Sequence, residues 1–307
     1  MYDLIIVGGG PAGVAGGIYA ARKKMKVALI TDHFGGQSLV SAEIQNWIGT
    51  AAISGLELGQ RLEEHLRAQD GIEIVDGDKA VRVEAVGGAS VFTVTTAGGR
   101  RFETTALLVA TGSRRRRLEV PGERELEGKG VAYCSTCDAP LFGGKAVAVV
   151  GGGNAGLEAV ADLLPYASRV YLLELSGALR GDAVTREKIQ NHPSVEIVLN
   201  AEVETVVGEK WVRGLRYHPT GGGSTVEIPV EGVFVEVGIV PNSELVKELV
   251  ATNERGEIVV DSKTQATSVP GIWAAGDVSD GLYRQNNISA GDAVKAALNI
   301  YDRWKAR

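Results

Sequence analysis

Both cysteines of the chain stand close together, at Cys134 and Cys137, and the next residue is Asp138. In a reducing compartment, a C-x-x-C pair is typical of thiol–disulfide exchange or of half a metal site. A structural zinc ion needs four ligands, and this chain offers only two cysteines and four scattered histidines, so we expect no metal. A carboxylic acid beside a thiol can hold the proton that the thiol gives up. This favours redox chemistry over two cysteines that pack as small hydrophobic side chains.

A glycine-rich turn follows the cysteines. Ala146 to Val150 is a short apolar run that predicts a strand, the turn holds Gly151, Gly153 and Gly156, and we expect a helix to begin at Asn154. In a dinucleotide-binding turn, the first glycine permits the tight bend, the second lets the backbone approach a pyrophosphate, and the third allows the helix to pack closely on the strand. The helix start adds unpaired N–H groups and the positive end of a dipole.

The strand predicted at Arg169 to Leu173 ends in Glu174. A carboxylate about 20 residues beyond such a turn accepts hydrogen bonds from the two hydroxyls of a ribose. The alternative is a solvated acid at the end of a strand.

The N-terminus repeats this pattern. An apolar strand is expected at Asp3 to Val7, GGGPAG follows at Gly8 to Gly13, and a helix then leads to a second strand at Lys26 to Ile30. One G-x-G-x-x-G is a weak signal, but two in the proper context, about 140 residues apart, are a strong one. The ribose position of the first turn stays open between Thr31 and Asp32.

Composition excludes several other classes. Hydrophobic residues make up 44% of the chain and charged residues 23%, which is ordinary for a globular protein. The net charge of −6 does not indicate a nucleic-acid partner. No apolar run reaches the ~20 residues that span a bilayer, and the chain enters a strand without a signal-peptide pattern. We therefore expect a cytoplasmic protein that does not contact a membrane.

The order of these elements predicts an α/β protein with two Rossmann-like, three-layer (ββα) nucleotide-binding domains, the second inserted in the first. We assign residues 1–115 and 243–307 to a discontinuous first domain. Residues 116–242 form the second, which carries the C-x-x-C pair. The chain crosses between them near 113–118 and 239–244.

Periodicity predicts the remaining elements. A helix is expected at Gly55 to Gln69, with Leu56, Leu62 and Leu66 on its apolar face. Four segments with period-two alternation predict an antiparallel meander: 73–75, 81–85, 91–95 and 101–103. Further strands are expected at 106–110, 195–199, 202–207, 212–217, 225–228, 233–237, 257–260 and 272–274, and further helices at 186–191 and 289–301.

With these pieces in place, the chain resembles the low-molecular-weight thioredoxin reductases over almost its whole length. The motifs that carry the resemblance are GGGPAG at Gly8, GGQ at Gly35, ATG at Ala110, CSTCD at Cys134, GGGNAG at Gly151, and GD with YRQ between Gly276 and Gln285. Within that group, CDAPLFGGK, VYLLE and FGGQ make it most similar to the flavoprotein subunit of alkyl hydroperoxide reductase, without that subunit's N-terminal thioredoxin-fold region.

The resemblance implies FAD at the first turn and NADH or NADPH at the second. It also implies that the polar segment Phe34 to Gly49 lies along the bound cofactor. The residues implied to bind FAD are Gly8, Gly10, Pro11, Ala12, Gly13, Gly36, Gln37, Asn46, Val81, Thr111, Gly112, Gly276, Asp277, Arg284 and Gln285. Those implied to bind the nicotinamide nucleotide are Gly151, Gly153, Asn154, Ala155, Gly156, Glu174, Arg180 and Gly238.

The resemblance also assigns roles at the dithiol. Cys137 faces the flavin, Cys134 attacks the disulfide of a partner, and Asp138 donates and accepts the proton. Because the dithiol and the nicotinamide site share one domain, each must take its turn at the flavin. The two domains are therefore expected to rotate about the linkers.

The nucleotide preference departs from that of ordinary thioredoxin reductases, which place a basic cluster after the second strand of this site. Here the run is Glu174 to Arg180, with a carboxylate first and only the last arginine kept. A carboxylate repels a 2′-phosphate and pairs with a free ribose diol, so we expect NADH to be preferred.

The sequence thus favours an FAD-dependent disulfide reductase that acts on thioredoxin or another small thioredoxin-fold protein, and the family is commonly homodimeric. Three alternatives stay open: the reductase component of a peroxiredoxin or alkyl hydroperoxide system, an NADH oxidase, and a redox-sensing flavoprotein. The arginines Arg114 to Arg117 are either a solvated linker or a docking patch for an acidic partner.

Overall fold

The computed structural model describes residues 1–41, 43–86, 91–180 and 182–306. The chain forms two compact units. Unit 1 comprises residues 1–39, 47–114 and 240–307, and unit 2 comprises residues 40–46 and 115–239. The divisions at 114/115 and 239/240 lie within three residues of the expected domain boundaries, whereas 40–46 group with the second unit.

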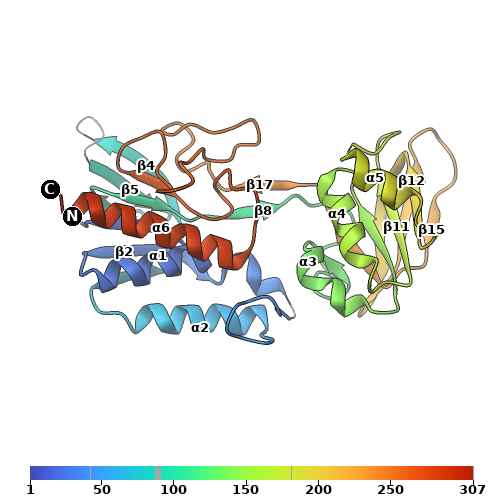
Figure 1. The fold of residues 1–307 in the computed structure, drawn as a ribbon, viewed down its shortest axis with the longest axis horizontal. Helices are drawn as coiled ribbons and strands as arrows, with labels where there is room; N and C mark the ends of the chain where they lie inside the picture. Colours follow the sequence, from blue (N-terminus) through green and yellow to red (C-terminus); the bar gives the residue numbers. More distant parts are fainter. Residues whose placement is uncertain (42, 87–90, 181, 307) are drawn as a thin grey trace. The chain divides into compact units, whose positions relative to one another are not determined.

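Unit 1 is built on a five-stranded parallel sheet of order β18-β7-β1-β2-β3. Its strands are β1 (Leu4–Gly9), β2 (Val27–Phe34), β3 (Ile72–Asp76), β7 (Leu107–Val109) and β18 (Ile272–Ala274). Strand β2 of this sheet is labelled in Figure 1. Strands β1, β7 and β18 are nearly continuous in apolar residues because both faces of the sheet are covered there, whereas β3 at the edge alternates.

Helices cover one face of this sheet. They are α1 (Pro11–Arg22), the 3-10 helix η1 (Gly36–Val40), α2 (Gly55–Arg67) and α6 (Asn286–Trp304). One core cluster joins Val14 and Ile18 of α1 and Ala293 of α6 to Leu4 and Ile6 of β1. The alternate residues of β1 face the other way, as the two-residue period of a strand requires.

An antiparallel meander covers the second face. It consists of β4 (Ala80–Val86), β5 (Val91–Thr96) and β6 (Arg101–Thr104). Phe92 and Val94 of β5 pack with Ile5 and Val7 of β1 in a second cluster. Unit 1 is therefore the expected three-layer ββα arrangement.

Unit 2 repeats this plan with a parallel sheet of order β12-β11-β10-β16-β9. Its strands are β9 (Val131–Ala132), β10 (Ala146–Val150), β11 (Arg169–Glu174), β12 (Val195–Leu199) and β16 (Gly232–Val235). A second meander comprises β13 (Ala201–Gly208), β14 (Val212–Pro219) and β15 (Val226–Ile228). The helices are α3 (Ser135–Asp138), the 3-10 helix η2 (Ala139–Phe142), α4 (Asn154–Leu163) and α5 (Ala183–Gln190).

The two faces of this sheet carry separate clusters. Leu157 and Val160 of α4 pack on Val147 and Val149 of β10, whereas Ala148 and Val150 face the meander. The structure therefore confirms two Rossmann-like units, the second inserted in the first.

The two chain crossings pair with each other. Strand β8 (Ser113–Arg115) and strand β17 (Ile239–Pro241) form a two-stranded ribbon. Gly112, with φ of +66°, and Gly238, with φ of +106°, flank the two strands.

Three predictions about elements were wrong. Strand β3 was expected in the antiparallel meander, but it pairs in parallel with β2 at the edge of the main sheet. Residues 257–260 form only isolated bridges at Ile258. In α2 the buried leucines are Leu58 and Leu66, whereas Leu56 is 60% exposed because it lies on the opposite side of the first turn.

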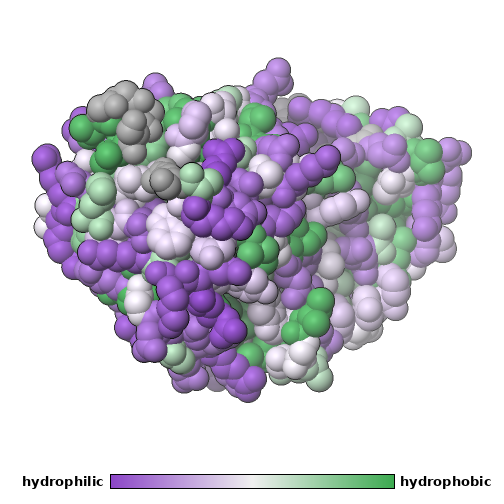
Figure 2. All heavy atoms as spheres, turned by 60° about the vertical axis from the view of Figure 1, so that its left-hand side comes forward, coloured by the Kyte–Doolittle hydropathy of each residue, from purple (hydrophilic) through white to green (hydrophobic). Residues whose placement is uncertain are grey.

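No helix in the described ranges is long and apolar enough to cross a membrane. Polar side chains cover much of the face seen in Figure 2, and apolar side chains appear between them in small groups.

Candidate functional site

The two cysteines form a disulfide at the start of α3. Cys134 precedes the helix with extended backbone, and its carbonyl oxygen accepts hydrogen bonds from the N–H groups of Cys137 and Asp138. Both cysteines are half-buried. The bond rules out the alternative of two separately packed thiols. Within the described residues no cluster of three or more His, Cys, Asp or Glu is suited to a metal ion.

Asp138 follows Cys137 directly in the sequence. Burial raises the pKa of Asp138 to about 6, and the positive charge of Arg115 opposes part of that shift. Near neutral pH the carboxyl group can therefore both donate and accept a proton.

A second acid, Glu236, was missed by the sequence analysis. Burial raises the pKa of Glu236 to about 7, against the effect of Arg115 and with help from the negative charges of Asp162 and Glu158. Its carboxyl group accepts a hydrogen bond from the backbone N–H of Ser135. The sequence could have pointed to Glu236, because it is a charged residue inside the apolar run Val233 to Val237.

The second glycine turn has the shape of a phosphate cradle. A Cβ on Gly151 would lie 2.4 Å from the carbonyl oxygen of Glu236, and one on Gly156 would lie 1.7 Å from that of Gly151. A Cβ on Gly153 would meet no atom within 4 Å. The first and third glycines are thus fixed by the protein's own backbone, and the second faces open space. This matches the division of roles in a dinucleotide-binding turn.

Glu174 closes over this turn. Its Oε2 accepts a hydrogen bond from the N–H of Gly152 at 2.6 Å, and its Oε1 accepts two from Ser176, from the N–H at 2.8 Å and the hydroxyl at 2.6 Å. Burial alone would raise the pKa of Glu174, but these hydrogen bonds and the charge of Arg180 outweigh it and hold the pKa below its usual value. With only 7% of its surface exposed, Glu174 is not the solvated acid of the alternative interpretation.

The other predicted nucleotide residues surround the same turn. The N–H of Arg180 donates to the carbonyl of Gly152, and its guanidinium lies 3.6 Å from Glu174 Oε1 with 75% of the side chain exposed. Asn154 Oδ1 accepts a hydrogen bond from the N–H of Asp182. Ala155 is exposed at the start of α4, and Gly238 follows β16 with open space at its Cβ.

The first glycine turn has the same division of roles. A Cβ on Gly8 would lie 2.2 Å from the carbonyl oxygen of Ala110, and one on Gly13 would lie 1.8 Å from that of Gly8. A Cβ on Gly10 would meet only the Cα of Gly36, at 4.0 Å. Pro11 and Ala12 begin α1 directly behind this opening.

Further predicted residues gather at this end of the unit 1 sheet. Gln37 Nε2 donates to Ser113 Oγ at 3.0 Å and lies 3.5 Å from Asp277 Oδ2. A Cβ on Gly276 would lie 3.3 Å from that of Ala12, so the turn after β18 is next to the start of α1. Thr111 Oγ1 donates to the carbonyl of Asn242 at 2.7 Å.

Thr31 occupies the position that corresponds to Glu174. Ile30 pairs with Val7 beside the first glycine turn, as Leu173 pairs with Val150 beside the second. Thr31 is buried and donates to the carbonyl of His33, whereas Asp32 is about half exposed and contacts His33. By strand register, Thr31 and not Asp32 therefore occupies the position equivalent to Glu174.

The other five predicted FAD residues come from separate parts of the fold. Val81 lies in the meander with 52% of its surface exposed, Asn46 groups with unit 2, Gly112 precedes the ribbon, and Gln285 precedes α6. Arg284 forms an ion pair with the buried Glu257. In the predicted loop Phe34 to Gly49, residue 42 lies outside the described residues.

Arginines of the run Arg114 to Arg117 contact acidic residues of the chain. Arg114 forms an ion pair with Glu244, and Arg117 forms one with Glu127. Arg115 is close enough to Asp138 and Glu236 to affect their ionisation.

Known proteins that are similar to this chain indicate its family. The family model described as pyridine nucleotide-disulphide oxidoreductase matches residues 2–297. The chain is 41% identical over 302 residues to an alkyl hydroperoxide reductase component of Pseudomonas putida and 40% identical over 301 residues to a protein of Bacillus subtilis named NADH dehydrogenase. Each match covers 98% of this chain and 58% of the relative, so the chain spans little more than half their length.

A solved thioredoxin reductase of Streptococcus pyogenes superposes with a TM-score of 0.92 at 31% identity, covering 100% of this chain and 99% of that one. Membership implies a flavin and a nicotinamide nucleotide, and the glycine turns described above fit two dinucleotides. On the family model and these relatives, the chain belongs to the pyridine nucleotide-disulphide oxidoreductase family.

Proposed function

We propose that this chain is an FAD-dependent disulfide reductase that takes electrons from NADH and delivers them through Cys134 and Cys137 to a thioredoxin-like protein. The observation that carries the proposal is the pairing, within unit 2, of a disulfide next to a proton-holding acid with a dinucleotide turn. Unit 1 adds a second turn of the same design.

When bound, the flavin would take a hydride equivalent from the nicotinamide and pass an electron pair to the disulfide. In the chain itself, Cys137 receives this electron pair, the Cys134–Cys137 bond breaks, and Cys134 is left as a thiolate. The Cys134 thiolate then attacks a disulfide of the partner and forms a mixed disulfide, which Cys137 resolves to release the partner as a dithiol. Asp138 holds the proton exchanged with the thiols, which its raised pKa permits.

The residues of unit 1 fit FAD. The open space at Gly10 suits a pyrophosphate, the start of α1 directs N–H groups toward it, and Asp277 and Gln37 supply polar groups for the rest of the cofactor. In unit 2, the ionised Glu174 favours the free ribose diol of NADH over the 2′-phosphate of NADPH.

Two partners fit the dithiol. Likeness to a thioredoxin reductase over the whole chain supports thioredoxin or another small thioredoxin-fold protein. The higher identity to the alkyl hydroperoxide reductase component supports a second candidate function, reductase of an alkyl hydroperoxide system, in which a peroxiredoxin is the final acceptor. The relative named NADH dehydrogenase supports a third candidate function, that of an NADH oxidase.

One variant separates these functions. With Cys134→Ser, we expect reduction of every redoxin to stop while NADH still reduces the flavin. If the purified Cys134→Ser variant still reduces a redoxin, the proposal is contradicted. If the variant oxidises NADH with oxygen as fast as the wild-type protein turns over, an oxidase is favoured. Adding a peroxiredoxin with and without thioredoxin then distinguishes the two reductase functions.

A homodimer and a cytoplasmic location are further proposals, and they rest on the family resemblance. Sedimentation equilibrium of the purified chain tests the first.

A further inference from the structure

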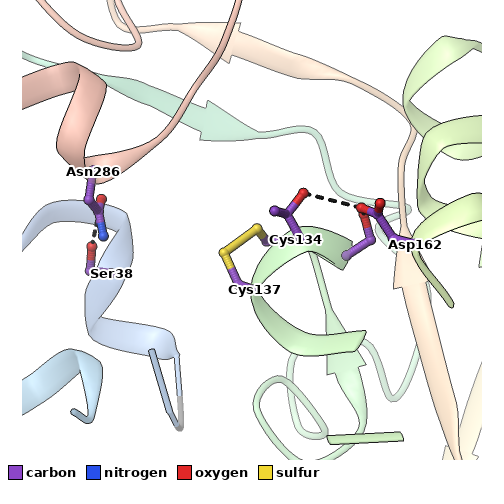
Figure 3. Close-up of a disulfide and its surroundings, with 7 residues drawn as sticks. Ser38, Cys134, Cys137, Asp162 and Asn286 are labelled. Atoms are coloured by element: carbon purple, nitrogen blue, oxygen red, sulfur yellow. Dashed lines mark hydrogen bonds between the residues drawn. A yellow bond between two sulfur atoms is a disulfide. The ribbon is translucent and has the colours of Figure 1, made fainter. Parts of the chain in front are cut away.

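The two residues between the cysteines are both bound to one carboxylate. Ser135 Oγ donates to Asp162 Oδ2 at 2.8 Å, and Thr136 Oγ1 donates to the same oxygen at 3.2 Å (Figure 3). Asp162 lies on α4, 26 and 27 residues further along the chain. Neither the glycine turn nor the C-x-x-C motif requires this contact.

The contact links the disulfide to the helix that begins at the second glycine turn. Helix α3 packs against α4, and Ser135 is buried at this junction. The backbone N–H of Ser135 is held separately by the carboxyl group of Glu236. The short turn between the sulfurs is therefore fixed from two elements, α4 and the end of β16.

We propose that Asp162 is a positioning residue which, through the hydroxyl groups of Ser135 and Thr136, holds the Cys134–Cys137 turn closed and shifts the dithiol–disulfide equilibrium toward the disulfide. This inference deepens the proposed function, since it concerns the redox balance of the same dithiol.

Two effects of Asp162 act in the same direction. The hydrogen bonds order the turn in the disulfide form. A looser turn in the dithiol form would weaken them, so the contact and the disulfide would favour each other by linkage. The carboxylate also places negative charge near the cysteines, which disfavours the thiolate formed on reduction. Both effects make the dithiol a stronger reductant.

The test is the equilibrium of the purified full chain with a glutathione redox buffer, measured anaerobically at pH 7 by counting alkylated cysteines. Asp162→Ala is expected to lower the equilibrium constant for disulfide formation by about fivefold to tenfold, which is less than the full strength of the two hydrogen bonds because only their difference between the disulfide and dithiol forms contributes. Asp162→Asn keeps an oxygen acceptor and should give a smaller shift in the same direction. Glu187→Gln, at an exposed acid of α5, is the matched control and should leave the constant unchanged.

A second variant separates the contact from the charge. Ser135→Ala with Thr136→Val removes both donors and keeps Asp162, so it should reproduce most of the Asp162→Ala shift even if that variant does not fold. Equilibrium constants within twofold of wild type in the variants that fold, or a shift toward the disulfide, would overturn the proposal. Because neither nucleotide nor partner is added, this outcome is independent of whether the chain reduces a redoxin.

Discussion

The carboxyl group of Asp138 is partly removed from water, next to the disulfide. Its pKa is raised to about 6, so between pH 4 and 6 the folded chain keeps a proton that the unfolded chain releases. The contribution of Asp138 to the stability of the folded state therefore falls as pH rises through this window.

Asp138→Asn removes this pH dependence. We expect the oxidised variant to be more stable than wild type above pH 6, by about 1–2 kcal/mol, with no difference below pH 4. Reduction of the partner should slow by about tenfold to a hundredfold, because the proton-holding group is lost. Denaturant unfolding between pH 4 and 8 and redoxin turnover measure the two effects, with Asp70→Asn as an exposed control. Equal stability of variant and wild type at all pH values would disprove the role of burial.

Glu174 is the residue that we propose sets the nucleotide preference of the second unit. Its charge is stabilised by Ser176, Gly152 and Arg180, so a 2′-phosphate would meet an ionised carboxylate. We expect kcat/KM to be higher for NADH than for NADPH, by about tenfold or more. Glu174→Gln should narrow the ratio by raising the efficiency with NADPH. A wild-type preference for NADPH would refute this prediction.

Sequence motifs located the reactive residues but not the groups that hold them. Cys134, Cys137, Asp138 and Glu174 stand at fixed offsets within short motifs, so spacing alone identifies them. Asp162 and Glu236 contact Ser135 from 27 and about 100 positions away, and only the tertiary fold brings them there.

At the scale of the element, each glycine turn has two glycines that the fold requires and one, between them, that faces open space. A Cβ on Gly156 would overlap the backbone of Gly151, whereas a Cβ on Gly153 would meet no atom within 4 Å. Substitution by alanine should therefore have different effects at the two sites.

Gly156→Ala is expected to destabilise unit 2 by about 1–3 kcal/mol, since its Cβ would overlap the carbonyl of Gly151 and force α4 away from β10. Gly153→Ala should leave stability unchanged and raise KM for NADH by about tenfold or more, because the Cβ blocks the pyrophosphate. Thermal unfolding and steady-state kinetics measure these effects, with Gly221→Ala, whose Cβ also meets no atom within 4 Å, as the control. An unaltered KM for Gly153→Ala would count against a nucleotide at this turn.

Strand β10 was predictable because its apolar run is buried and ends at a glycine turn. Strands Ala146 to Val150 and Val195 to Leu199 have the expected bounds. The failures lie where local pattern and tertiary pairing differ. β3 alternates like a meander strand but pairs in parallel with β2. Glu257 begins an alternating run that predicts a strand, but its side chain forms an ion pair with Arg284.

At the scale of the whole molecule, the proposed function requires motion. The nucleotide turn and the disulfide belong to unit 2, and the flavin cradle belongs to unit 1, so both redox centres must reach the flavin in turn. The β8–β17 ribbon, flanked by Gly112 and Gly238, is the proposed hinge.

A photocleavable lysine cross-linker that bridges the two units is expected to stop turnover with a redoxin, and cleavage by light should restore it. The monofunctional form of the same reagent controls for lysine modification. Full activity of the bridged protein would exclude a rotation mechanism.

The most direct test of the central claim is anaerobic titration of the flavin-loaded chain with NADH, following flavin absorbance and the number of alkylated thiols together. The account predicts that NADH bleaches the flavin and that two thiols per chain appear, at Cys134 and Cys137, ready to reduce a thioredoxin-like protein. A chain that binds no flavin, or one whose flavin is reduced while the disulfide stays intact, would contradict it.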